Sequence, residues 1–431
     1  MLILLSILFS FLIIVLLKRL KCVEGSSGIA LSFVFSFWFY YALIPLLIGI
    51  ISEKSTKSNE YFITFMRGGG MGNVAYFLVV TIFILVFVFS YTQARSYKFY
   101  EIDRKRFFKL TKIAGYIALF GGGVCLIIYF HLMGGLVRAL SYAEFNRSFA
   151  YSMEDVVGQY FILFRPAKLI TIAPFCLSFL FFATKGKSKK QMLYFIGAIA
   201  LALGFYLYDA SRSSLMIYLV ALSFPIISHY VKHPWFLIFV CGMVGLNMLN
   251  VLDSLFVYFA TGDFEVEAFN WNEIIHQFSH PYRNVCFSFD IALQGGIRFG
   301  RDFVTDFLSF IPGVNFEQSY VPTCEFFIGP NWHAEGGIPN DIITFSIIEF
   351  FFLGIFIIPY VVGKLVRKLD DFFTLAFKND QLKTASIMLQ AYLILLVFFN
   401  TASSDFVAIL QGYSLFVFFF IPIYSLKKAH K

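Results

Sequence analysis

Residues 74–92 read VAYFLVVTIFILVFVFSYT and contain no charged side chain. An uncharged apolar stretch of about 18 residues or more is typical of a helix that crosses a lipid bilayer. The composition extends this interpretation to the whole chain, because 59% of its 431 residues are hydrophobic and only 14% are charged. A soluble protein of this length could not bury that much apolar surface. The sequence therefore predicts an all-α polytopic membrane protein.

Similar stretches recur along the chain and predict about eleven transmembrane helices. Their approximate ranges are 2–17, 29–52, 74–92, 113–132, 160–183, 192–208, 214–231, 235–258, 342–362, 384–400 and 405–425. The first is interpreted as a span and not as a signal peptide, because its cations follow it and no small-residue cleavage site appears. The predicted organisation is transmembrane helices with short loops over 1–258, one large loop over 259–341, and further transmembrane helices with a tail over 342–431.

The net charge of +8 is interpreted as a topology signal, because the basic residues lie in short loops between the predicted spans; a nucleic-acid partner is not supported. Basic clusters occur at 18–21, 95–112, 185–190, 232, 364–383 and 427–431. They fall on every second loop, so the positive-inside rule places these loops in the cytoplasm. The N-terminus and the large loop 259–341 are then expected outside, and the C-terminus in the cytoplasm.

The large outer loop is long enough to fold over a site and is expected to contain helices of its own. Apolar residues recur in it at helical spacing, with polar residues opposite and a Pro-Gly pair behind them. The apolar set is Phe303, Val304, Phe307, Leu308 and Ile311; the polar set is Asp302, Thr305 and Asp306; Pro312 and Gly313 follow. Such a helix would lie on the outer membrane surface or cap the bundle. Two cysteines share this loop, Cys286 and Cys324, and either a disulfide or two free thiols is compatible with the sequence.

A cluster of ionisable residues precedes an apolar segment in residues 329–356, GPNWHAEGGIPNDIITFSIIEFFFLGIF. His333, Glu335 and Asp341 are candidates for a general base, since each could accept a proton from a sugar hydroxyl. A histidine in a loop is nevertheless more often an ordinary surface residue. Glu349 lies about two turns into the predicted span, where a carboxylate is rare. It is interpreted as a proton or ion site, or as a group that orients an arginine.

Several arginines lie in the predicted outer segments or beside them. They are Arg147, Arg165, Arg212, Arg283, Arg298 and Arg301. The planar guanidinium group suits phosphate oxygens, so an arginine set at the membrane interface would suit a lipid pyrophosphate. The alternative for each is that it reaches to lipid headgroups or pairs with a nearby carboxylate, as Asp209 could with Arg212. No metal or cofactor is indicated, because the chain shows no DxD motif in its outer loops, no P-loop, no Rossmann glycine pattern and no GxSxG.

This layout resembles the Wzy-type polymerases, which join oligosaccharide repeat units of bacterial O-antigen or capsule. The resemblance lies in the span count, in DASRSSLMIYLV with Arg212 opening a span, and in DFLSFIPG followed later by GGIPNDIITFSIIEFFFLGIF. The last stretch is similar to a pattern of the wider O-antigen ligase and polymerase group, and Asp341, Glu349 and Gly354 match its spacing. Where ligases of that group have a histidine, this chain has Asn340, which argues against a ligase.

The resemblance implies a GT-C-like helical fold and glycosyl transfer at the periplasmic face of the bacterial inner membrane. Donor and acceptor would both be oligosaccharides on undecaprenyl pyrophosphate, and a chain-length regulator is a further partner that the resemblance leaves open. Arginines and Asn340 would bind pyrophosphate or glycan, and Glu349 would support them. The main alternative is a lipid-linked oligosaccharide flippase or another transporter, although no internal repeat is evident. A purely scaffolding membrane protein is the third alternative.

Overall fold

The structure is a computed structural model in which helices make up nearly all of the described chain. The described residues are 1–25, 28–54, 71–93, 97–141, 162–184, 188–209, 212–238, 254, 258, 262, 275, 278–308, 320–329, 338–402 and 414–429. Within these ranges two short strands, β1 (Tyr100–Ile102) and β2 (Leu426–Lys428), pair antiparallel. The described part of the chain is therefore all-α apart from this pairing, as the sequence predicts.

Seven helical segments in the described part of the chain are long and apolar enough to cross a membrane. They are Leu2–Lys21, Ile29–Ile50, Asn73–Gln93, Arg104–Leu132, Lys189–Tyr208, Ile342–Phe377 and Asp380–Asn400. Two shorter apolar segments are Lys168–Ala183 and Ser214–Tyr230. Large apolar side chains such as Leu4, Phe11, Leu78 and Phe89 are more than half exposed, as expected of a surface that faces lipid tails. The chain is thus a membrane protein, whereas the predicted span 235–258 lies mostly outside the described residues.

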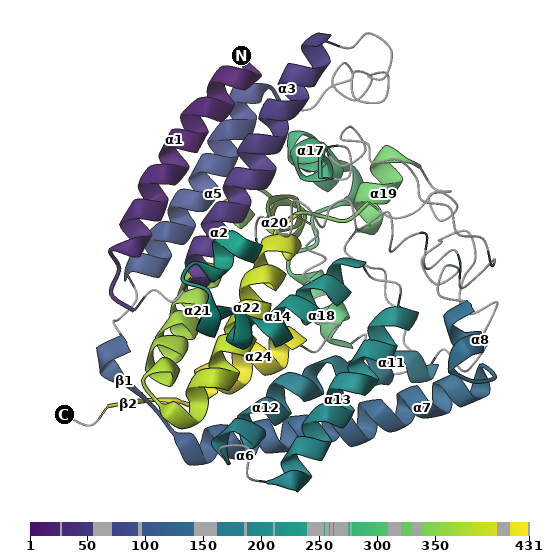
Figure 1. Cartoon of the computed structure of the whole chain (residues 1–431). Helices are drawn as coiled ribbons and strands as arrows, with labels where there is room; N and C mark the ends of the chain where they lie inside the picture. The colour runs from purple at the N-terminus through teal and green to yellow at the C-terminus, as the bar shows by residue number, and fades with distance from the viewer. Residues whose placement is uncertain are drawn as a thin grey trace.

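The helices before residue 240 form the larger part of the fold (Figure 1). They are α1 (Leu2–Lys21), α2 (Ile29–Trp38), a π-helical turn (Phe39–Leu43), α3 (Ile44–Lys54), α5 (Asn73–Gln93), a 3-10 turn (Tyr97–Phe99), α6 (Arg104–Tyr116), a π-helical stretch (Ile117–Gly122), α7 (Gly123–Leu132), α8 (Leu136–Ser141), α11 (Phe164–Ala167), a 3-10 turn (Lys168–Ile172), α12 (Ala173–Ala183), α13 (Lys189–Tyr208) and α14 (Arg212–Tyr230). The later helices are α17 (His280–Gly295), α18 (Arg301–Leu308), α19 (Val321–Phe327), α20 (Ile342–Phe350), a 3-10 turn (Phe351–Leu353), α21 (Gly354–Phe377), α22 (Asp380–Asn400) and α24 (Ser414–Tyr424).

The middle of the bundle is built around α21 and α22. Helix α21 packs along α5, while α22 contacts α2, α12 and α14. Gly363 permits the close approach of α21 to α5, because a Cβ there would lie 2.6 Å from the carbonyl oxygen of Phe87. Helices from distant parts of the sequence therefore share one core, into which α20 also packs through α17 and α21.

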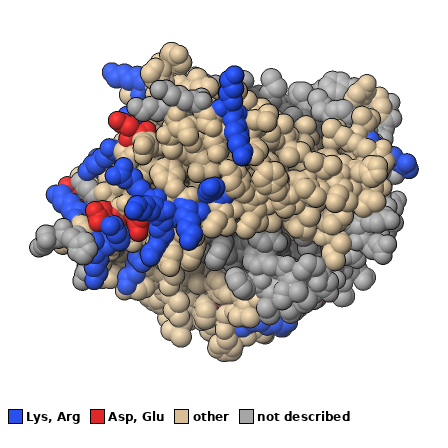
Figure 2. Space-filling model, turned by 90° about the horizontal axis from the view of Figure 1, so that it is seen from below, with Lys and Arg blue, Asp and Glu red and all other residues tan. Residues whose placement is uncertain are grey.

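Basic side chains gather at one end of the molecule, which we call the basic end (Figure 2). Its exposed cations come from three of the predicted cytoplasmic clusters. They are Lys18, Arg19, Lys21, Lys98, Arg104, Lys105, Arg106, Lys109, Lys427 and Lys428. Lys98 pairs with Glu24 at 2.8 Å and Lys427 with Glu101 at 3.1 Å, while the β1–β2 pairing holds the C-terminal tail beside the start of α6. These three clusters thus share one end of the molecule.

Helix α5 connects the basic end to the opposite end of the molecule, which we call the α17 end. Its 21 residues span about 30 Å at 1.5 Å per residue. At its start, the hydroxyl of Tyr282 in α17 donates to the side chain of Asn73, and the amide of Met71 donates to the carbonyl of Cys286. Helices α17 and α19 therefore lie at the end remote from the basic cluster, and the N-terminus lies near this end as well (Figure 1).

The segment predicted as one span over 342–362 is interrupted and longer than expected. Helix α20 ends at Phe350 because Phe351 adopts a left-handed backbone (φ 51°), and a 3-10 turn leads into α21. Helix α21 then continues to Phe377, through positions predicted as a cytoplasmic loop. The charged stretch is helical because it is amphipathic: Lys364 and Lys368 are exposed, whereas Val366 and Leu369 are buried.

The predicted helix that includes Asp302 exists as α18, but two residues of its expected polar face are buried and one of its expected apolar face is exposed. Asp302 is fully buried and Thr305 is 8% exposed, whereas Val304 is 59% exposed. Asp302 is buried because it forms an ion pair with Arg298 inside the protein. Cys286 in α17 and Cys324 in α19 are both buried free thiols, which decides between the two alternatives left open by the sequence.

Candidate functional site

The segment 338–341 and the first residue of α20 after it are held by four separate parts of the chain. Asn284 of α17 donates through Nδ2 to the carbonyl of Pro339 at 2.9 Å. The hydroxyl of Thr323 in α19 donates to the side-chain oxygen of Asn340, and the amide of Ile338 donates to Sγ of Cys324 in the same helix at 3.1 Å. The remaining two contacts come from Tyr41, in the π-helical turn after α2, and from Thr401, at the end of α22.

The end of α22 anchors both α20 and α17. The first amide of α20, that of Ile342, donates to the carbonyl of Thr401 at 3.3 Å. Nε2 of His280, the first residue of α17, lies 2.8 Å from the carbonyl oxygen of Ala402. Thr401 also accepts from Ser36 of α2 through its hydroxyl, at 2.9 Å. Segment 338–341 thus has a fixed position, and the preceding residues, among them the predicted His333 and Glu335, lie outside the described residues.

Asp341 is the N-cap of α20 and is fully buried. Its Oδ1 accepts three hydrogen bonds, from the amides of Ile343 (3.0 Å) and Thr344 (3.1 Å) and from the hydroxyl of Tyr41 (2.9 Å). Oδ2 lies near the Thr344 side chain without hydrogen-bond geometry. Burial raises the pKa of Asp341 to about 6, while these hydrogen bonds counteract the rise. Because a bulky sugar hydroxyl could not reach a buried oxygen, Asp341 is better suited to positioning α20 than to accepting the proton.

Asp341→Asn is expected to flatten the pH dependence of stability between about pH 4 and pH 6. The wild-type carboxyl has a pKa of about 6 in the folded protein against an ordinary 3.8, so its stabilising contribution is complete at low pH and is lost as the pH rises through 6. The difference amounts to about 3 kcal/mol. Asn keeps an acceptor for the cap but cannot ionise. Melting temperatures of the purified protein over this pH range test the prediction, with the exposed Asp380→Asn as control; equal slopes in the Asp341 variant and the wild type would contradict it.

Arg283 lies on α17 next to Asn284, and its guanidinium group is placed over the ring of Phe327 in α19, 4.3 Å from the ring centre. It is partly exposed, whereas its neighbours Tyr282 and Asn284 are buried. A stacked arginine loses little further freedom when it binds an anion, because the ring already orients its planar fork. Arg283 is thus the predicted arginine that the structure brings beside segment 338–341.

Among the described residues, the other predicted arginines are not gathered beside Arg283. Arg147 lies outside the described residues, as do the side chains of Arg165 in α11 and Arg212 at the start of α14. Arg301 is exposed at the start of α18. Nη1 of Arg298 contacts Oδ1 of Asp302 at 2.7 Å, and both side chains are buried. Asp302 therefore neutralises the charge of Arg298.

Glu349 lies beside this ion pair and not beside Arg283. It is fully buried on α20, about two turns after Asp341, where its carboxyl group interacts electrostatically with Asp302 and Arg298. Of the sequence-predicted residues, the structure therefore brings Arg283, Asn340 and Asp341 together at the start of α20, and Arg298 and Glu349 together further along it. Among the described residues, no group of three or more His, Cys, Asp and Glu side chains could hold a metal ion.

No family model, curated protein or solved structure matches this chain. The resemblance to Wzy-type polymerases accordingly depends on the quoted residues alone, and function has to be argued from the geometry of the site.

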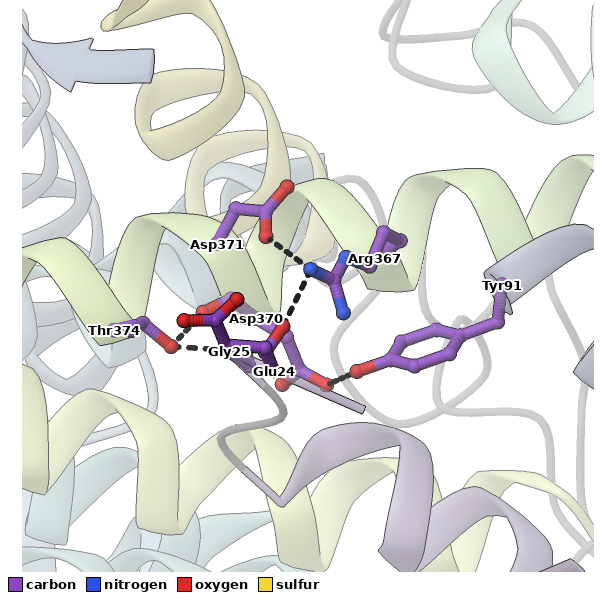
Figure 3. Close-up of polar contacts among 7 residues, drawn as sticks. All are labelled: Glu24, Gly25, Tyr91, Arg367, Asp370, Asp371 and Thr374. Atoms are coloured by element: carbon purple, nitrogen blue, oxygen red, sulfur yellow. Dashed lines mark hydrogen bonds and ion pairs between the residues drawn. The ribbon is translucent and has the colours of Figure 1, made fainter. Parts of the chain in front are cut away.

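A second buried charged cluster lies at the basic end, and the sequence analysis did not single it out. Nη2 of Arg367 in α21 donates to the carbonyl of Glu24 at 2.7 Å and pairs with Asp371 at 3.0 Å (Figure 3). Asp370 accepts from the hydroxyl of Tyr91 at 2.6 Å and from the first amide of α2 at 3.3 Å. The cluster ties α21 to α5 and to the α1–α2 connection. The sequence carries this cluster as R-x-x-D-D at helical spacing, within the stretch 364–383 that is interpreted above as a basic cytoplasmic loop.

Proposed function

We propose that this protein polymerises oligosaccharide repeat units carried on undecaprenyl pyrophosphate, at the periplasmic face of the bacterial inner membrane. The observation that supports this most strongly is the position of Arg283. It lies at the end of the bundle remote from the basic cluster, beside the fixed segment that follows the candidate bases His333 and Glu335. By the positive-inside rule, this end is periplasmic and the C-terminus is cytoplasmic, in a chain with the predicted eleven or so spans.

The proposed reaction is a displacement at the anomeric carbon of the donor. The oxygen of an acceptor sugar hydroxyl forms the new bond, the bond to the pyrophosphate oxygen breaks, and undecaprenyl pyrophosphate leaves with the electron pair. The hydroxyl proton passes to His333 or Glu335. Arg283, together with Arg147, Arg165, Arg212 and Arg301 from the sequence prediction, stabilises the charge on the leaving pyrophosphate. Asn340 and Asp341 position the start of α20 beneath the site.

The arrangement of the described residues favours this chemistry over a role in the bilayer core. Arg283 and segment 338–341 lie at one end of the bundle, where a headgroup pyrophosphate and its glycan would be found, and the lipid-facing helices would accommodate the polyprenyl chain. A flippase is the second candidate, favoured by one observation: charged residues, Glu349 and Arg367, are buried within a single apolar helical segment, Ile342–Phe377. Buried charges of this kind also occur in transporters.

The discriminating experiment uses the purified full-length protein with a lipid-linked repeat unit. In detergent, a ladder of products separated by one repeat unit supports polymerisation. In sealed vesicles, appearance of the repeat unit on the far side without a ladder supports a flippase and contradicts the proposal.

A further inference from the structure

We propose that Asp302 and Glu349 bind one proton between them, forming a proton-binding site that fastens α18 to α20. This inference is independent of the reaction proposed above, because neither carboxyl group is assigned a chemical step there. Three observations carry it: the burial of the pair, the charge count around it, and the poor hydrogen bonding of its oxygens.

The first observation is burial. Asp302 and Glu349 are fully buried, and Arg298 is 9% exposed. Their surroundings are aromatic: Phe303 of α18 packs against Phe345 and Phe350 of α20, with ring centres 5.3 and 6.4 Å apart. An ionised carboxylate in such surroundings requires a full set of partners, since its transfer from water costs several kcal/mol.

The second observation is the charge count. Arg298 contributes one positive charge, and two ionised carboxylates would contribute two negative charges, so the group would have a net charge of −1 inside the protein. Among the described residues, the charged groups that interact with Glu349 are Arg298 and Asp302. On the helices that pack against α20, Asp290 of α17 and Lys364 of α21 are exposed. One proton makes these three described side chains neutral together.

The third observation is that buried oxygens lack well-formed hydrogen bonds. Nη1 of Arg298 donates to Oδ1 of Asp302, while Oδ2 of Asp302 and both oxygens of Glu349 are buried without a hydrogen bond of good geometry among the described residues. The amide of Gly300 and the side chain of Asp302 both lie near the Glu349 carboxyl group. A proton on Glu349 would convert one unsatisfied acceptor into a donor toward Oδ2 of Asp302. No covalent bond other than the O–H bond changes, and the proton comes from solvent. The two carboxyl groups then titrate as one unit.

A bound proton explains the group better than a bound metal cation. The guanidinium of Arg298 is already part of the group, so a cation would meet a positive charge at close range. The backbone also has a fixed shape here: the amide of Arg298 donates to the carbonyl of Ile348 at 3.1 Å, and Phe299 has a left-handed φ of 49°. The turn 298–300 is thus bound to α20 on both its main chain and its side chains, and the shared proton completes this attachment.

The test compares Glu349→Gln with Glu349→Ala in the purified full-length protein. The amide of Gln imitates a protonated carboxyl, so Glu349→Gln should keep the wild-type melting temperature at neutral pH and should not lose stability at alkaline pH as the wild type does. Glu349→Ala should melt lower at every pH, because it leaves a cavity and removes the hydrogen bond to Asp302. The exposed Glu325→Gln on α19 is the control and should behave as the wild type.

Infrared spectroscopy supplies a readout that a merely structural role would not change. At about pH 8, where Asp341 with its pKa of about 6 is ionised, the wild type should show the carbonyl band of a protonated carboxylic acid. Glu349→Gln should lose this band, and Glu325→Gln should keep it. The proposal is overturned if the band is the same in wild type and Glu349→Gln, if Gln destabilises as much as Ala, or if Na⁺ in place of a proton stabilises the wild type at alkaline pH.

Discussion

Arg283→Ala is expected to reduce polymer formation by a factor of about 100 or more, with the protein still inserted and folded. The factor follows from the roughly 3 kcal/mol that one preorganised donor contributes to a developing negative charge in a site shielded from water. Arg283 is preorganised because its guanidinium group is stacked on Phe327, and α17 is itself anchored to α5 and α22. The measurement is the rate of appearance of each rung of the glycan ladder with purified protein and lipid-linked repeat unit.

Two further variants make this experiment specific. Arg283→Lys keeps the charge but loses the planar fork, so it should fall between Ala and wild type. Arg138→Ala removes an exposed arginine of α8 that is not among the proposed site residues, and it should leave the ladder unchanged. An unchanged ladder in Arg283→Ala, or equal losses in the Arg138 and Arg283 variants, would remove Arg283 from the site.

Gly354→Ala is expected to prevent the protein from accumulating in a folded form. A Cβ at position 354 would lie 1.8 Å from the carbonyl oxygen of Ser346, which is backbone and cannot move aside without displacing α20. Overpacking of this kind costs about 3 kcal/mol, a large part of the stability of an ordinary domain. The cause is the break at Phe351, which turns the chain sharply and brings the start of α21 against α20.

The matched control for this glycine is Gly197 of α13, where an added Cβ would meet nothing within 4 Å. Gly197→Ala should be neutral or stabilise the protein by about 0.5–1 kcal/mol, because Ala is the better helix former. Yield of monodisperse protein after detergent extraction and its melting temperature report both effects. A Gly354→Ala protein as abundant and as stable as Gly197→Ala would show that α20 and α21 do not pack as described.

Hydropathy was sufficient to predict the class of fold. Runs such as 74–92 are uncharged over the length of a bilayer, and the clusters around Lys18, Arg106 and Lys427 indeed share one end of the molecule. The break inside the segment Ile342–Phe377 was not predictable in this way, because Phe351 is as apolar as its neighbours and only its backbone angle ends the helix.

The candidate site was predictable in its residue types but not in its pairings. Asp341 next to an apolar run is a recognisable helix cap, and the spacing of Arg298 and Asp302 allows an ion pair. The contact of Tyr41 with Asp341, however, joins residues 300 positions apart, and the buried side of α18 depends on a partner, Glu349, from another helix. The same holds for Arg367, whose partners Glu24 and Asp371 make a buried cluster from what the local sequence presents as a solvated charged stretch.

The central claim is that sugar is transferred with a lipid pyrophosphate as the leaving group. The most direct measurement is therefore the amount of undecaprenyl pyrophosphate released by the purified protein for each new glycosidic bond, with a lipid-linked repeat unit as the sole substrate. We predict one molecule of free undecaprenyl pyrophosphate per bond, formed together with the ladder and lost in Arg283→Ala. No release of the lipid while the repeat unit crosses a sealed vesicle intact would contradict the account.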